Sequence, residues 1–249
     1  YEIGMEANKI KPSWKSFKEG VHAGGGQWMT QVYHYAGAFF AFLASKVGLT
    51  PNHLTLMSAV TVTLAMWAMF YGMGRGLDWA IVVTLLSIIS YSLDCADGQL
   101  ARATKQCSKF GAWLDHVLDA AKVFVVNFSV GWMLICHSEI FQMSFKYAFL
   151  AMAVNITGSA LYFFAWNYKV MIAGEGLIAR LSDETTSNRV RLMKFYHQFT
   201  DYGWFPIIFV FLAFPSKFAL LYLVYGCGTF LVFTAYIIIS ASYMKKLNS

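Results

Sequence analysis

Charged residues are scarce in this 249-residue sequence, because Asp, Glu, Lys and Arg together make up only 13% of it. Hydrophobic residues account for 58% and aromatic residues for 18%, and the mean hydropathy is +0.51. A soluble domain of this length needs more charge to cover its surface, whereas lipid solvates apolar side chains on the outside of a helical bundle. The composition therefore excludes an ordinary soluble domain and predicts a chain that crosses a membrane several times.

Three further absences narrow the class of protein. The four cysteines, Cys95, Cys107, Cys136 and Cys227, have no CxxC or metal-ligand spacing, so neither a disulfide nor a thiolate metal site is expected. No basic stripe interleaved with aromatic residues occurs, so the net charge of +6 does not indicate a nucleic-acid partner. The first 30 residues lack an apolar core with a small-residue cleavage site, and no signal peptide is predicted. The positive charge fits anionic lipid and phosphate-bearing substrates better.

Six apolar segments have about the 20 residues that a transmembrane helix needs. They cover residues 52–73, 78–100, 111–136, 146–167, 202–216 and 218–243. The fifth is the shortest and is expected to begin earlier, near Phe199. Pro215 interrupts the last apolar stretch, because proline lacks a donor and disfavours helical geometry in the preceding residue. This break predicts a tight helical hairpin.

The segment before the first span, Gln27–Val47, is ambiguous. It is long enough to cross a bilayer, but its polar residues recur at near-helical spacing, which favours an amphipathic helix in the interface plane. Thr50-Pro51-Asn52 then has the composition of a helix start. We therefore expect an all-α integral membrane protein. A cytoplasmic N-terminal arm and an interfacial helix would occupy residues 1–48, and a six-helix membrane domain would occupy residues 49–249.

The distribution of basic residues predicts the orientation of this bundle. With six spans, the N-terminal arm, the loops at 101–110 and 168–198 and the C-terminus lie on one side and carry fifteen Lys and Arg residues. The opposite loops carry three, which are Arg75, Lys146 and Lys217. By the positive-inside rule, the first group faces the cytoplasm.

Two pairs of aspartates flank a short basic turn between the second and third spans. Asp94 and Asp97 are three residues apart, so they share one face of a helix. Asp115 and Asp119 are four residues apart and share a face of the next helix. Four of the seven aspartates in the chain thus fall within 26 positions. Because the short turn makes the two helices antiparallel neighbours, the pairs should meet near the cytoplasmic surface.

Carboxylates at membrane depth need a compensating cation, since one charged residue at a helix centre costs about 2.5 to 3.5 kcal/mol on insertion scales. Oxygen ligands select hard divalent ions, Mg²⁺ or Mn²⁺ before Zn²⁺. Two such ions would match four carboxylates and could clamp a pyrophosphate during displacement at phosphorus. The alternative is that the aspartates form ion pairs in a structural turn or a proton path. The basic partners would then be Arg102, Lys105, Lys109 and Lys122.

The string from Asp94 to Asp119 resembles the signature of the CDP-alcohol phosphotransferase family, D-x-x-D-G-x-x-A-R-x8-G-x3-D-x3-D, and meets each of its fixed positions. The resemblance implies two ions of Mg²⁺ or Mn²⁺ on the aspartates, with Asp119 completing the second site and acting as the general base. It also implies a pocket for the cytidine diphosphate group. That pocket would be formed by Asp94, Gly98, Ala101, Arg102 and Gly111.

The resemblance further implies a phospholipid-synthesis enzyme that moves a phosphatidyl group from CDP-diacylglycerol to a small polar alcohol and releases CMP. A homodimer is the usual state of the family. One alternative is transfer of a head group from CDP-choline or CDP-ethanolamine to diacylglycerol, although that class resembles longer chains. An ion or proton transporter that uses the aspartates is the alternative of another class.

Two weaker patterns accompany the motif. Basic residues of the loop after the fourth span fit an ordinary cytoplasmic loop, or a pocket for a phosphorylated acceptor as the family uses. The candidates for such a pocket are Lys169, Arg180, Arg189 and Arg191. Lys122 lies three residues past Asp119, where it either tunes that carboxylate or neutralises charge in the bundle, and we favour neutralisation.

Overall fold

The structure of the chain is a computed structural model that describes residues 13–20, 28–173 and 202–247. Within these residues the ordered elements are helices, and no strand occurs. The predicted all-α class is therefore confirmed.

Five helices of the described part are long and apolar enough to cross a membrane. They are α3 (Pro51–Tyr71), α4 (Leu77–Ala103), α5 (Lys109–Cys136), α6 (Phe145–Ala173) and α10 (Pro215–Leu247). Each of these helices corresponds to one predicted span. Most of their first and last residues differ from the predicted bounds by four residues or fewer. Large apolar side chains such as Trp67, Phe128 and Leu231 are exposed on the outside of this bundle, as expected of helices solvated by lipid. The chain has the features of a multi-pass membrane protein.

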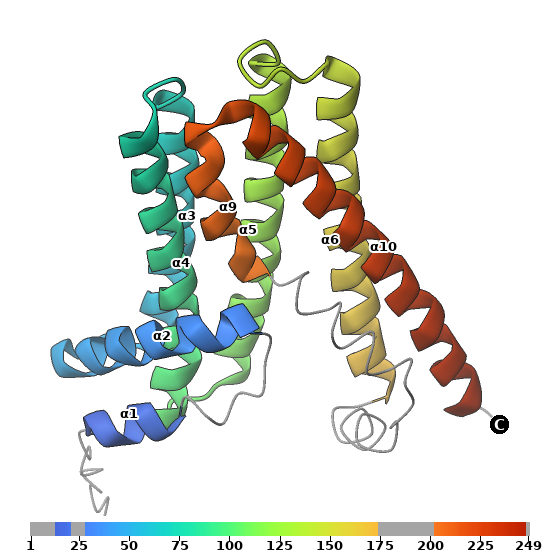
Figure 1. Cartoon of the computed structure of the whole chain (residues 1–249). Helices are drawn as coiled ribbons and strands as arrows, with labels where there is room; N and C mark the ends of the chain where they lie inside the picture. Colours follow the sequence, from blue (N-terminus) through green and yellow to red (C-terminus); the bar gives the residue numbers. More distant parts are fainter. Residues whose placement is uncertain (1–12, 21–27, 174–201, 248–249) are drawn as a thin grey trace, which may run out of the picture.

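The predicted span at residues 202–216 corresponds to three short segments instead of one long helix. These are η2 (Tyr202–Trp204), α9 (Phe205–Phe209) and η3 (Val210–Ala213), of which α9 and η3 run beside α4 (Figure 1). Phe214 leaves helical geometry, and α10 begins at Pro215, so the predicted break at this proline is confirmed. The count of six spans stays a prediction.

Two further helices lie at one end of the bundle, α1 (Trp14–Gly20) and α2 (Trp28–Val47). Figure 1 shows α2 running across the long helices, close to the lower part of α4. A Cβ added at Gly37 would lie 2.9 Å from Cβ of Cys95, so glycine lets the two backbones approach closely here. The Gln99 amide also donates a 3.0 Å hydrogen bond to the His34 carbonyl. The placement of α2 in a membrane interface stays a prediction.

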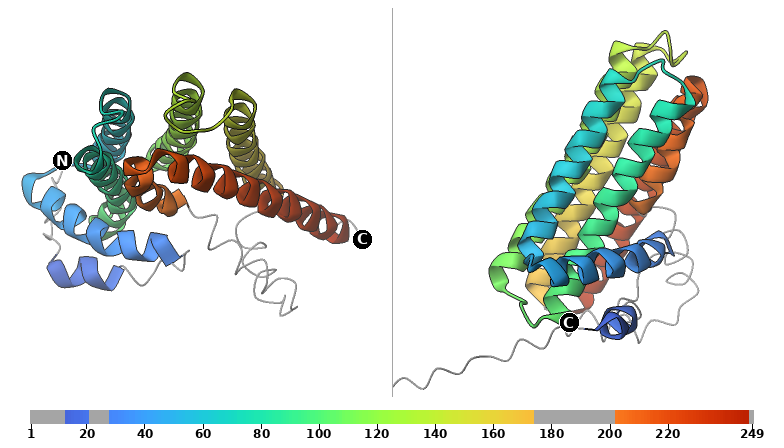
Figure 2. Two further views of the ribbon diagram at one scale, coloured as in Figure 1. Left: turned by 45° about the horizontal axis from the view of Figure 1, so that its top comes forward. Right: turned by 90° about the vertical axis from the view of Figure 1, so that its left-hand side faces the viewer.

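The ends of the long helices fall into two sets. In Figures 1 and 2 the loops at 72–76 and 137–144 lie at one end of the bundle, and the turn at 104–108 lies at the other end with α1. Successive loops thus alternate between the two ends of the bundle, as the predicted order of spans requires. The assignment of the second end to the cytoplasm, and the division at residue 48, remain predictions.

Candidate functional site

A tight turn joins α4 to α5 and brings their ends together. At the end of α4, the N–H of Gln106 donates a 2.8 Å hydrogen bond to the carbonyl of Ala101, and Lys105 adopts a left-handed φ of 57°. This geometry is a helix C-cap. Ser108 then caps α5 by accepting a 2.9 Å hydrogen bond from the N–H of Gly111. As a result, the last turns of α4 lie beside the first turns of α5.

The two aspartate pairs meet across this helix pair. Ligand oxygens of Asp94, Asp97 and Asp115 all lie within 4.8 Å of one another. A second group of possible ligands, Asp115, His116 and Asp119, satisfies the same limit. The spacing of the aspartates therefore predicted a real cluster, in which Asp97 is only 5% exposed. The first group supplies oxygen ligands alone, which fits a hard divalent cation.

α3 contributes to the cluster although it carries no acidic residue. The hydroxyl of Thr55 donates a 2.6 Å hydrogen bond to Oδ2 of Asp97. Thr55 carries no charge, so the pattern of carboxylates in the sequence did not point to it. Its position one turn into α3, at the same end of the bundle as the aspartates, was the available signal.

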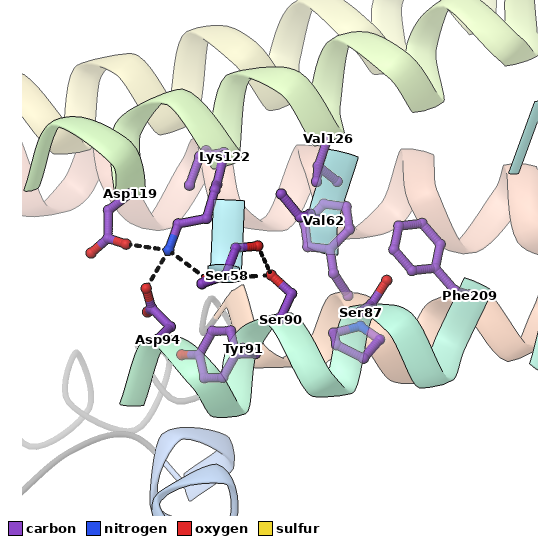
Figure 3. Close-up of a pocket in the computed structure, with 13 residues that line it drawn as sticks. Ser58, Val62, Ser87, Ser90, Tyr91, Asp94, Asp119, Lys122, Val126 and Phe209 are labelled. Carbon is purple, nitrogen blue, oxygen red and sulfur yellow. Dashed lines mark hydrogen bonds and ion pairs between the residues drawn. The ribbon is translucent and has the colours of Figure 1, made fainter. Parts of the chain in front are cut away.

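Lys122 lies inside the cluster and is 8% exposed. Its ammonium contacts Oδ1 of Asp94, lies 2.8 Å from Oδ1 of Asp119 and donates a 3.2 Å hydrogen bond to Oγ of Ser58, as Figure 3 shows. These contacts agree with the expected neutralising role. The other basic residues considered from the sequence, Arg102, Lys105 and Lys109, form no ion pair with these aspartates within the described ranges.

Two pockets border the cluster. One is bounded by the turn, the end of α4 and the starts of α3 and α5, and it includes Asn52, Thr55, Ser108 and Asp115. All four non-acidic residues predicted for the nucleotide line this one pocket, namely Gly98, Ala101, Arg102 and Gly111. The other pocket lies on the Lys122 side, between hydroxyls of α3 and α4 and the rings of Phe205 and Phe209 on α9.

Both motif glycines keep the first pocket open. A Cβ at Gly98 would lie 3.0 Å from Nη1 of Arg102. A Cβ at Gly111 would lie 3.0 Å from Oγ of Ser108 and 3.1 Å from Oδ1 of Asn52. The sequence had not identified Asn52 as a pocket residue, because its contact depends on how α3 packs against α5.

The structure does not describe the side chains of the residues predicted to bind the acceptor. Arg180, Arg189 and Arg191 lie outside the described residues, and so does the side chain of Lys169. Their role stays a prediction.

Comparison with known proteins gives one family and two relatives. A family model described as CDP-alcohol phosphatidyltransferase matches residues 48–177, which is more than half of the chain. The chain is 37% identical over 75 residues to an archaetidylinositol phosphate synthase of Pyrococcus horikoshii, covering 30% of this chain and 37% of the relative. It is 36% identical over 70 residues to a bifunctional IPC transferase and DIPP synthase of Aquifex aeolicus, covering 28% of this chain and 15% of the relative.

Proposed function

Because the chain belongs to the CDP-alcohol phosphatidyltransferase family, we propose that it transfers a phosphatidyl group from CDP-diacylglycerol to the hydroxyl of a small polar alcohol and releases CMP. The observation that supports this most directly is the carboxylate cluster of α4 and α5 beside a pocket that is lined by the four non-acidic residues predicted for the nucleotide. A divalent-metal site and a diphosphate pocket are the two features that phosphoryl-group displacement requires.

The pocket bounded by the turn would bind the cytidine diphosphate group. Arg102 is exposed at this pocket and offers a planar pair of donors to phosphate oxygens. Gly98, Ala101 and Gly111 have little or no side chain, so the diphosphate can approach the backbone of both helices. Asp94, which belongs to the carboxylate cluster, would lie next to the bound cytidine diphosphate group.

The metal would be Mg²⁺ or Mn²⁺, held by Asp94, Asp97 and Asp115. Asp119 would complete a site for a second ion, for which the Lys122 ammonium competes. When bound, the divalent charge would stabilise the diphosphate and the leaving CMP. The side chain of Thr55 would hold Asp97 in a fixed orientation toward that charge.

Asp119 would act as the general base. Its side chain is 42% exposed and borders the pocket on the Lys122 side, so an acceptor hydroxyl could approach it. The acceptor oxygen would form a bond to the phosphatidyl phosphorus, and the bond from that phosphorus to the CMP oxygen would break. The hydroxyl proton would pass to the Asp119 carboxylate.

A phosphorylated alcohol is the first acceptor to test, because one relative is named archaetidylinositol phosphate synthase. The loop residues Lys169, Arg180, Arg189 and Arg191 would bind its phosphate group. The active site would face the cytoplasm, where such acceptors are dissolved, and the chain would work as a homodimer in the membrane.

The test is CMP release by the purified full chain in detergent, with CDP-diacylglycerol, Mn²⁺ or Mg²⁺ and a panel of acceptors. Inositol phosphate, glycerol phosphate and serine form the panel, and mass spectrometry identifies the lipid product. CMP should appear only with a metal and an acceptor, and EDTA should abolish it. If CMP appears with CDP-choline and diacylglycerol but not with CDP-diacylglycerol, the donor is CDP-choline, and the alternative of head-group transfer to diacylglycerol holds. No CMP with any donor would contradict the proposal.

A further inference from the structure

The Lys122 ammonium is held within the acidic cluster by three acceptors on three helices. They are Asp94 on α4, Asp119 on α5 and Ser58 on α3 (Figure 3). An ammonium group has three N–H donors, so these acceptors are sufficient to use all of them. With its side chain only 9% exposed, Lys122 is a fixed internal cation and not a mobile surface lysine.

This cation divides the four aspartates into two pairs, one that contacts the ammonium and one that does not. Asp97 and Asp115 form no ion pair with a lysine or arginine within the described residues, and Asp97 is instead bonded to the Thr55 hydroxyl. Asp94 and Asp119, in contrast, share the ammonium between them. A divalent ion among the oxygens of Asp94, Asp97 and Asp115 would therefore share only Asp94 with the ammonium, which contacts Oδ1 of that carboxylate.

The position between Asp94 and Asp119 is different. A second divalent ion there would lie next to the ammonium at short range in a poorly solvated site, where like charges repel strongly. Either the ion or the ammonium can hold this position, but the two together are unfavourable.

We propose that Lys122 occupies the place of the second divalent ion, so that the resting protein binds one ion tightly and admits a second only when the ammonium withdraws. This inference rests on the metal site of the proposed function. It makes Lys122 a positioning residue that sets the number of bound ions, and it explains how four carboxylates within a membrane bundle are compensated before the donor arrives.

The test is a Mn²⁺ titration of the full chain in detergent without nucleotide, with free Mn²⁺ measured by electron paramagnetic resonance. Wild type should bind one ion tightly. Lys122→Met should bind two, with the affinity for the second ion raised about 10- to 100-fold and with spin coupling between the ions. Lys122→Arg keeps the charge and should bind one. Lys105→Met removes an exposed lysine of the nearby turn and should also bind one.

Two tight ions in wild type, or one ion in folded Lys122→Met, would overturn the inference. A lysine with a merely structural role would leave the stoichiometry unchanged in every variant. If Lys122→Met does not fold, the counts for wild type and Lys122→Arg still decide, because two tight ions in either contradict the inference. Two ions in a wild type that releases CMP would remove only this inference, whereas no bound ion and no CMP would remove the proposed function as well.

Discussion

The hydroxyl of Thr55 on α3 donates a 2.6 Å hydrogen bond to Oδ2 of Asp97 on α4, and both residues are at least 95% buried. Oδ1 of the same carboxylate accepts the backbone N–H of Gly98. A carboxylate fixed at both oxygens cannot rotate freely. α3, which carries none of the aspartates, therefore helps to orient one of the proposed metal ligands.

Thr55→Val should lower the affinity for Mn²⁺ about 10- to 100-fold, because loss of a hydrogen bond to a ligating carboxylate has effects of that size. Valine has nearly the shape of threonine, so the helix packing should survive. Thr55→Ser keeps the hydroxyl and is the matched control. The measurement is a Mn²⁺ titration of each protein in detergent. A valine variant with the affinity of wild type would show that the hydrogen bond does not support the site.

Asp119→Asn should reduce kcat by about 10²- to 10⁴-fold, the usual contribution of a general base, while CDP-diacylglycerol still binds. The amide cannot accept the proton of the acceptor hydroxyl. Asp78→Asn is the control, since Asp78 is an exposed aspartate in the first turn of α4, at the far end of the helix. The rate of CMP release and the binding of the donor are measured separately. An Asp119→Asn protein with a near-normal rate would refute the assignment as base.

Arg102→Lys should raise the KM for the CDP-linked donor about tenfold and change kcat less. Lysine keeps the charge but loses the planar pair of donors that grips two phosphate oxygens. Arg75→Lys, in the loop at the opposite end of the bundle, should leave both constants unchanged. Initial rates over a range of donor concentrations separate the two constants. A selective loss of kcat in Arg102→Lys would place its role after donor binding.

The sequence was sufficient to predict the helix pair that carries the aspartates. Spacings of three and four residues place each pair on one helix face, and a turn too short to cross the bundle forces α4 and α5 together. It was not sufficient to predict the partners of those aspartates. The contacts of Asp97 with Thr55 and of Lys122 with Ser58 join residues 42 and 64 positions apart. They depend on which face of α3 packs against its neighbours, which periodicity alone does not determine.

Hydropathy did not predict that residues 202–213 would form a series of short helices. The same apolar composition suits both a span and such a series, and Phe205 and Phe209 of α9 are buried in the core as residues of a span would be. Pro206 fits the first turn of α9, where its missing N–H is tolerated. The roles of the motif residues in catalysis stay predictions until the variants are measured.

Two glycines of α10 provide a test of how this helix packs against α6. A Cβ at Gly226 would overlap Nδ2 of Asn155, whose amide is fixed by hydrogen bonds to the carbonyls of Ala151, at 2.9 Å, and Tyr222, at 3.3 Å. A Cβ at Gly228 meets no atom within 4 Å. Gly226→Ala should therefore destabilise the fold by about 1 to 3 kcal/mol through overpacking. Gly228→Ala should be neutral or slightly stabilising, because alanine is the better helix former. Thermal unfolding in detergent should give a Tm lowered by several degrees for the first variant only, at about 2 to 4 °C per kcal/mol. Equal Tm values for the two variants would mean that Gly226 does not lie against Asn155 in the folded protein.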